Sequence, residues 1–249
     1  MRESDSIREG RNVVLEALRQ QIPVDRLFVQ EGRLSGNLET VVREAKKQKI
    51  DIKFVSKDRL DGISETGKHQ GVIAYISQWQ YSQLSDVLNN ASEKNEDPFL
   101  FVLDGITDPH NLGAIIRTAN TVGAHGVIIK KHGAAGLTSA CAKSSAGAIF
   151  YTPVVRVTNI SKTIEELKKH GLWFVCADMD GCSYYDLDLT GPLAIVIGDE
   201  GKGISDLVKK KCDYVASIPV RGEIESLNAS VAVGVMSYEV LRQRNAAIV

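Results

Sequence analysis

Residues 99–117 read FLFVLDGITDPHNLGAIIR, an apolar run followed by a polar turn and a second apolar pattern. Consecutive apolar residues bounded by turn signals predict a buried strand at 99–103. Asp108 is suited to cap a helix and Pro109 to occupy its first turn, so a helix is expected at 112–122. A buried strand that leads directly into a helix is typical of a parallel sheet covered on both faces.

The same alternation continues to the end of the chain. Further strands are expected at 126–129, 154–157, 173–177, 193–197 and 215–219. Helical apolar patterns separate most of them, at 139–148, 160–170, 204–211 and 227–244. The predicted fold class is therefore α/β, with a mainly parallel sheet in a large C-terminal domain.

A smaller α/β unit precedes that sheet. Its expected elements are helices at 13–18 and 38–47 and strands at 26–30, 52–55 and 71–76. Residues 79–97 carry four acidic residues and one basic residue and are rich in Asn and Ser, a composition typical of a linker. We therefore expect an N-terminal domain at 1–78, a linker at 79–97 with one short helix at 84–88, and the larger domain at 98–249.

Composition excludes several classes of protein. The 249 residues are 43% hydrophobic, which rules out a disordered or fibrous chain. Thirty basic and 31 acidic residues leave a net charge of -1, so any nucleic-acid binding must come from local patches. The longest apolar runs fall far short of the roughly 20 residues of a spanning helix, and residues 1–14 lack a signal-peptide core. A soluble, cytoplasmic protein without a membrane partner is expected.

The sequence does not support several familiar types of site. The four cysteines form no C-x-x-C pair, so neither a zinc site nor a disulfide framework is expected, and no metal is predicted. Gly62–His69 resembles a phosphate-binding loop, but His69 stands where Ser or Thr must reach magnesium, and a polar loop is the better interpretation. Ser226 lacks the G-x-S-x-G of a hydrolase, so a helix N-cap is its simpler role.

Three polar segments follow apolar strands, at the edge where open parallel sheets bind ligands. The first, 104–117, contains Asn111 and Arg117. Their six-residue offset is about 240° on a helix, so they need not contact the same ligand atom. A structural interpretation, in which Asn111 belongs to the cap and Arg117 is solvated, is equally open.

The second segment, 197–203, ends in the glycine-rich run GDEGKG. Glycines let the backbone approach a ligand closely, and a helix start favours anionic groups. A tight turn with solvated Asp199 and Glu200 is the alternative. The third segment, 218–230, offers Ser226 and Asn228 as hydrogen-bonding groups near the start of a long helix.

Together, the segments 104–117, 197–203 and 218–230 resemble the three motifs of the SpoU/TrmH family of RNA 2′-O-ribose methyltransferases. The resemblance covers nearly the whole chain. His69-Gln70-Gly71 in the small domain is similar to a segment of the RlmB-type branch, whose members methylate a guanosine of 23S ribosomal RNA. The resemblance implies a SPOUT-type trefoil knot, S-adenosyl-L-methionine as cofactor, a homodimer formed by the C-terminal domain, and a ribosomal-protein-like RNA-binding domain at the N-terminus.

The resemblance also assigns residues. Those expected to hold the cofactor are Gly198, Gly201, Ile218, Ser226, Leu227 and Asn228. Those expected at the reaction site are Asn111, Arg117, Glu200, Ser226 and Asn228. Arginine stays protonated above pH 12, so we interpret Arg117 as a clamp on a phosphate that also stabilises alkoxide charge, in its own subunit or across the dimer. Glu200 has the better chemistry for a base, with His110 as the alternative.

The substrate implied by the resemblance is a guanosine of large-subunit ribosomal RNA. Transfer RNA is the nearest alternative, and Asp199 and Lys202, which depart from RlmB-type sequences, could shift that preference. A non-catalytic RNA-binding or ribosome-assembly protein is the alternative from another class, although five intact polar positions argue against it. A nucleotide-sensing α/β domain would bind the cofactor without salt-dependent RNA affinity.

Overall fold

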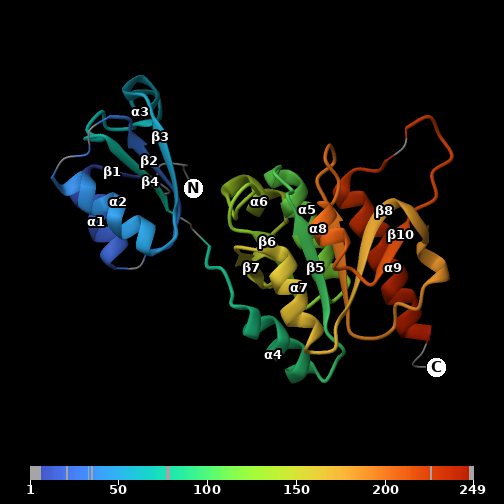
Figure 1. Ribbon diagram of the computed structural model, residues 1–249. Helices are drawn as coiled ribbons and strands as arrows, with labels where there is room; N and C mark the ends of the chain where they lie inside the picture. The colour runs from blue at the N-terminus through green and yellow to red at the C-terminus, as the bar shows by residue number, and fades with distance from the viewer. Residues whose placement is uncertain are drawn as a thin grey trace. The chain divides into compact units, whose positions relative to one another are not determined.

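The computed structural model describes residues 7–20, 22–32, 34, 36–76, 79–224 and 226–246. The chain divides into two compact units, Met1–Gln80 and Tyr81–Val249 (Figure 1). The expected domain ends at residues 1 and 249, and Glu225 of the third segment, lie outside the described residues. None of the described helices is long and apolar enough to cross a membrane.

The first unit is a four-stranded sheet in the order β1-β4-β2-β3. Its elements in chain order are β1 (Ile7–Glu9), α1 (Arg11–Arg19), β2 (Val24–Gln30), α2 (Asn37–Lys47), β3 (Asp51–Val55), α3 (Lys57–Ile63) and β4 (Val72–Ile76). Apolar residues of α1 and α2 form a core with one face of the sheet. Leu60 of α3 packs against Phe28 and Ile73 on the other face. β1 and α3 were not predicted from the sequence, because each is too short to produce a periodic pattern.

The second unit contains a six-stranded, all-parallel sheet in the order β10-β8-β9-β5-β6-β7. Its strands are β5 (Phe99–Asp104), β6 (Gly126–Lys130), β7 (Val154–Val157), β8 (Trp173–Ser183), β9 (Leu193–Gly198) and β10 (Tyr214–Ser217). Its helices are α4 (Leu84–Lys94), α5 (Pro109–Thr121), α6 (Ser139–Ser144), α7 (Ile160–Lys168), α8 (Asp206–Lys209) and α9 (Ala229–Ala246). The predicted α/β class with a mainly parallel sheet is confirmed.

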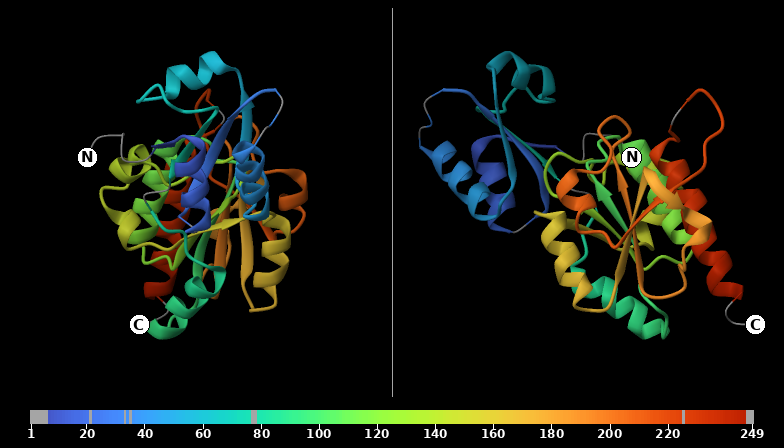
Figure 2. Two further views of the ribbon diagram at one scale, coloured as in Figure 1. Left: turned by 90° about the vertical axis from the view of Figure 1, so that its left-hand side faces the viewer. Right: turned by 45° about the vertical axis from the view of Figure 1, so that its right-hand side comes forward.

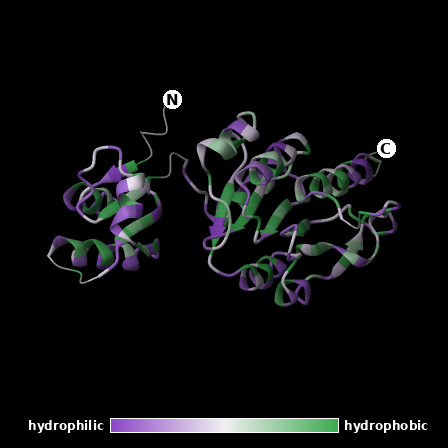
Figure 3. Cartoon of the chain, turned by 90° about the horizontal axis from the view of Figure 1, so that it is seen from above, coloured by the Kyte–Doolittle hydropathy of each residue, from purple (hydrophilic) through white to green (hydrophobic). Residues whose placement is uncertain are grey.

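The sheet is covered on both faces, which explains its uniformly apolar strands. Helices α7 and α8 lie on one face, and α5 and α9 lie on the other (Figure 2). Every residue of β5 is buried, and the strands are the most hydrophobic part of the unit (Figure 3). Asp104 at the end of β5 is in register with Gly198 at the end of β9, which brings the first two polar segments to one edge.

The expected linker at 79–97 is wrong for most of its length. Residues 81–97 belong to the second unit, and α4 spans Leu84–Lys94 rather than 84–88. Val87 and Ala91 on α4 are buried, and a Cβ at Gly126 would lie 2.7 Å from Val87 Cγ2, so the helix packs tightly on the sheet. Apolar residues at 84, 87, 88 and 91 form one face of a helix, a pattern that the polar composition of the segment obscured.

Other boundaries differ from the expectations by a few residues. β8 extends to Ser183, six residues past the predicted end, because β10 pairs with it as far as Ser217. The predicted helix at 139–148 ends at Ser144 and is followed by a short 3₁₀ turn at Ala148–Phe150, and the one at 204–211 is the single turn α8. The trefoil knot stays a prediction.

Candidate functional site

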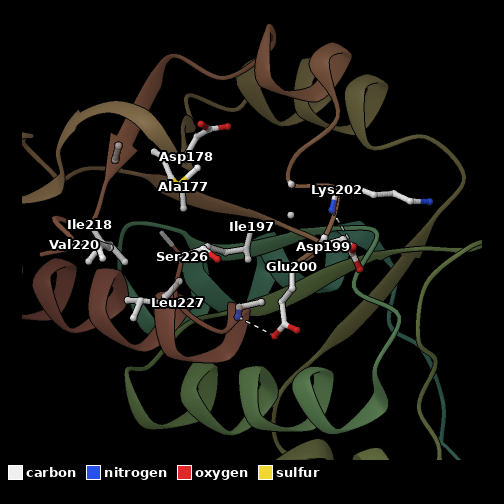
Figure 4. A pocket seen from close by; sticks show the side chains of 17 residues that line it. Ala177, Asp178, Ile197, Asp199, Glu200, Lys202, Ile218, Val220, Ser226 and Leu227 are labelled. Atoms are coloured by element: carbon white, nitrogen blue, oxygen red, sulfur yellow. Dashed lines mark hydrogen bonds between the residues drawn. The ribbon is translucent and has the colours of Figure 1, made fainter. Parts of the chain in front are cut away.

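A pocket of about 390 Å³ opens at the carboxyl edge of the large sheet (Figure 4). The ends of β8, β9 and β10, the glycine-rich loop 199–203 and the start of α9 line it. Ile197, Ile218, Val220 and Leu227 give it an apolar wall. Its size and its mixture of apolar side chains with backbone polar groups are those of a small-molecule site.

The glycine-rich loop folds back tightly on itself. A Cβ at Gly198 would overlap the backbone of Gly203 and Ile204, so only glycine fits there. Gly203 has φ +67°, a conformation that glycine adopts without strain. The Asp199 carbonyl accepts a hydrogen bond from the Gly203 N–H at 2.7 Å, and its Oδ1 accepts from Gly201 N at 3.0 Å. The Asp199 side chain therefore shapes the loop and is not simply solvated.

A buried carboxylate anchors the end of this loop to the sheet. Asp104 is 3% exposed and forms an ion pair with Lys130. Asp104 Oδ2 accepts hydrogen bonds from Ser205 N at 2.8 Å and Ser205 Oγ at 2.6 Å. Burial by itself raises the pKa of Asp104, but the hydrogen bonds from Lys130 and Ser205 outweigh it and hold the pKa below its usual value.

The three polar segments meet at Glu200. Its Oε1 accepts hydrogen bonds from Asn111 Nδ2 at 2.9 Å, from Asn228 Nδ2, and from the Ala229 N–H at 3.3 Å. Asn228 Nδ2 also donates to Asn111 Oδ1 at 3.0 Å. Residues 111, 200 and 228, far apart in sequence, thus form one connected cluster. Of the three, Glu200 also lines the pocket (Figure 4).

Asn228, not Ser226, caps the last helix. α9 begins at Ala229, and Asn228 Oδ1 accepts hydrogen bonds from Ser230 N at 3.0 Å and Val231 N at 3.4 Å. The N-cap role expected for Ser226 is therefore wrong, because the helix starts three residues later. Ser226 instead lines the pocket.

The expected cofactor residues divide into two groups. Those that line the pocket are Gly198, Gly201, Ile218, Ser226 and Leu227. Asn228 is not among the residues that line it and belongs to the polar cluster.

The structure does not bring Arg117 to that cluster. Arg117 is exposed on α5, where its offset from Asn111 turns it to another face of the helix. It makes no hydrogen bond or ion pair with any residue in the described ranges. His110 Nδ1 lies 2.9 Å from Ser144 Oγ on α6, away from Glu200. Glu200 is thus the titratable group that the fold places at the junction of all three segments.

Asp178 lines the pocket but was not predicted from the sequence. It follows the predicted strand 173–177, so its position at the carboxyl end of a parallel strand was an available signal. Asp178 Oδ2 lies 2.9 Å from Lys209 Nζ. Burial by itself raises the pKa of Asp178, but the hydrogen bonds from Lys209 and from the Asp180 and Met179 N–H groups, together with the charge of Lys209, outweigh it and hold the pKa below its usual value. Among the described residues, no cluster of three or more His, Cys, Asp or Glu could hold a metal ion.

Comparison with known sequences gives two family matches. Residues 98–238 match the SpoU rRNA methylase family, and residues 8–82 match the family described as RNA 2′-O ribose methyltransferase substrate binding. The Bacillus subtilis protein YacO, which carries the name of a TrmH family tRNA/rRNA methyltransferase, is 47% identical over 237 residues, 95% of each chain. A Staphylococcus haemolyticus protein named for the same family is 43% identical over 97% of each chain.

Solved structures agree with the sequence matches. The SpoU methyltransferase AviRb from Streptomyces viridochromogenes, in complex with AdoMet, aligns with a TM-score of 0.62 and 28% identity over 96% of this chain and 90% of that one. A TrmH/SpoU tRNA modifying enzyme from A. aeolicus aligns with a TM-score of 0.56 and 26% identity over 61% of this chain and 78% of that one. The chain therefore belongs to the SpoU/TrmH family of S-adenosylmethionine-dependent RNA 2′-O-ribose methyltransferases.

Proposed function

We propose that the target of this methyltransferase is a guanosine of large-subunit ribosomal RNA, modified in the cytoplasm by a homodimer. The observation that carries the reaction-site assignment is the cluster of Asn111, Glu200 and Asn228 beside the pocket. Transfer RNA is the second candidate substrate, because the names of the relatives cover both RNAs and one structural neighbour is a tRNA modifying enzyme.

The pocket fits S-adenosylmethionine. Gly198, Gly201 and Gly203 line the pocket, so part of its wall is backbone without side chains, which lets polar ligand atoms approach N–H and C=O groups. Ile218 and Leu227 offer the apolar surface that an adenine ring requires. Gly201 and Ser226 complete the proposed cofactor cradle. When bound, the cofactor supplies a methyl group carried on a positively charged sulfur.

Glu200 is proposed to accept the proton of the ribose 2′-OH. Its Oε1 is occupied by three N–H donors, which fixes the orientation of the carboxylate. Its Oε2 has no hydrogen bond to any residue in the described part of the chain, so this oxygen is available to a substrate hydroxyl. Asn111 and Asn228 hold the carboxylate in place, and oriented groups of this kind can supply much of the rate.

Replacing the carboxylate tests this assignment. Glu200→Gln keeps the shape and removes the base, so we expect single-turnover methyl transfer to slow by about 10²- to 10⁴-fold. Binding of S-adenosylhomocysteine, measured by calorimetry, should remain close to wild type. Wild-type turnover by this variant would leave Glu200 without a role as the base.

Arg117 is proposed to act in the partner's site. Its side chain lies outside the cluster of its own subunit, so it can serve as a phosphate clamp only where a second subunit brings RNA to it. α9, which packs against α5, exposes Val231 and Tyr238 on the face opposite the buried Val233 and Met236. An exposed apolar stripe on a helix supports an interface, here with a second copy.

Subunit mixing tests the dimer and the role of Arg117 together. Arg117→Ala and Glu200→Gln should each be nearly inactive, because each homodimer lacks one component in both sites. Random exchange gives half heterodimers with one intact site each, so a mixture should recover about a quarter of wild-type activity. No recovery, with subunit exchange verified by mass spectrometry, would place Arg117 in its own subunit's site.

The substrate is tested by labelling. Methyl transfer from radiolabelled S-adenosylmethionine to total RNA of a strain lacking this gene, followed by nucleotide mapping, should give one 2′-O-methylguanosine in large-subunit RNA. Label on transfer RNA would show that the second candidate is the substrate. No label on free RNA or on ribosomal particles, despite cofactor binding, would favour the non-catalytic RNA-binding protein.

A further inference from the structure

Asp178 is a pocket-lining carboxylate that belongs to none of the three family motifs. It stands just past the level where β8 pairs with β9, since Cys176 is in register with Val196. In Figure 4 it lies on the opposite side of the pocket from Leu227 and Glu200. The pocket therefore has a carboxylate on the side opposite Leu227, and this carboxylate is separate from the proposed reaction cluster at Glu200.

The hydrogen bonds of Asp178 leave acceptor capacity unused. Oδ2 pairs with Lys209 Nζ at 2.9 Å, Oδ1 accepts a long hydrogen bond from the Asp180 N–H at 3.3 Å, and the Met179 N–H also donates to the carboxylate. An ionised carboxylate offers about four lone-pair sites. Its side chain is 23% exposed and lines the pocket. A molecule bound in the pocket can therefore donate further hydrogen bonds to this carboxylate.

The charges of Asp178 and Lys209 decide which kind of hydrogen-bond donor a ligand can offer to this carboxylate. Lys209 already neutralises Asp178, so an incoming ammonium group would sit beside a second ammonium and be repelled. Neutral hydroxyl groups donate to the same carboxylate without that penalty. A carboxylate on the strand beside the one that leads into a glycine-rich turn is also an arrangement by which α/β folds hold a ribose hydroxyl.

We infer that Asp178 binds the ribose hydroxyls of S-adenosylmethionine, with Lys209 holding the carboxylate in position. The inference rests on the proposed placement of the cofactor in this pocket. It makes Asp178 a cofactor-binding residue with no part in proton transfer. Lys209 is a positioning residue, since it reaches the ligand only through Asp178.

Calorimetric binding of S-adenosylhomocysteine to the full chain tests the inference. Asp178→Asn should weaken binding by about tenfold, because a hydrogen bond to a charged group is lost. Asp180→Asn is the matched control: this carboxylate is 89% exposed and 3.8 Å from the same lysine, but does not line the pocket. It should bind as wild type does. Unchanged melting temperatures of both unliganded variants would show that folding is intact.

An analogue of S-adenosylhomocysteine without the two ribose hydroxyls isolates the contact. Wild type should lose about tenfold in affinity for the analogue, and Asp178→Asn should lose nothing further. Equal losses in both proteins would overturn the inference. So would a penalty for Asp178→Asn that disappears with 5′-methylthioadenosine, since that ligand lacks only the amino-acid part. No binding of S-adenosylhomocysteine by wild type would instead contradict the proposed cofactor pocket.

Discussion

Replacing Gly198 by alanine tests how the glycine-rich loop builds the pocket. The added Cβ would lie closer than 3.0 Å to backbone atoms of Gly203 and Ile204, which cannot rotate away as a side chain can. Restoring the ordinary contact distance of 3.4 Å requires the loop to move by about 1 Å. Such overpacking costs about 2 kcal/mol, or about 6 °C in the Tm of a domain of this size.

The same displacement should disable methyl transfer. Glu200 lies between Gly198 and Gly203, and a misplacement of about 1 Å near a reacting group can cost about 10²-fold in rate. We expect Gly198→Ala to lower kcat/KM by about that factor and to weaken S-adenosylhomocysteine binding measured by calorimetry. Gly191→Ala is the control, because its Cβ would meet nothing within 4 Å. Gly198→Ala with wild-type Tm and wild-type binding would refute the reasoning.

Three further outcomes are expected. Asp104→Asn should destabilise the protein by about 3 kcal/mol by leaving Lys130 unpaired. The pKa of Asp104 in the folded protein is below its ordinary 3.8, so its contribution to the free energy of unfolding is full above pH 3.8. That contribution is lost as the pH falls through the folded pKa. The unfolding curves of wild type and variant in acid should therefore converge at low pH. Gly113→Ala should lower Tm in thermal melts, because its Cβ would clash with the backbone around Cys141. In iodoacetamide labelling at pH 8, burial, which raises the pKa of Cys141 to about 12, should keep that thiol unmodified while exposed Cys182 reacts.

Local patterns were sufficient for most of the fold. Apolar strands and amphipathic helices differ in period, so most elements of both units could be predicted from spacing alone. Asp108 and Pro109 fixed the start of α5, and Asp108 Oδ1 indeed accepts a hydrogen bond from His110 N at 2.9 Å. Short elements such as α3 were missed, and α4 was predicted only at 84–88, because the burial of these elements depends on partners distant in sequence.

The same distinction between local and tertiary information applies to the candidate site. The sequence determined that three polar segments follow strands, because glycine, proline and small polar residues have local conformational preferences that act within a few residues. Only the tertiary structure decided which side chains meet: strand order places β9 beside β5 and β8, so Glu200 joins Asn111 and Asn228, and Asp178 enters the pocket. Arg117 stays apart because helix geometry turns it away. Such contacts depend on packing between segments up to 117 residues apart, which no local pattern specifies.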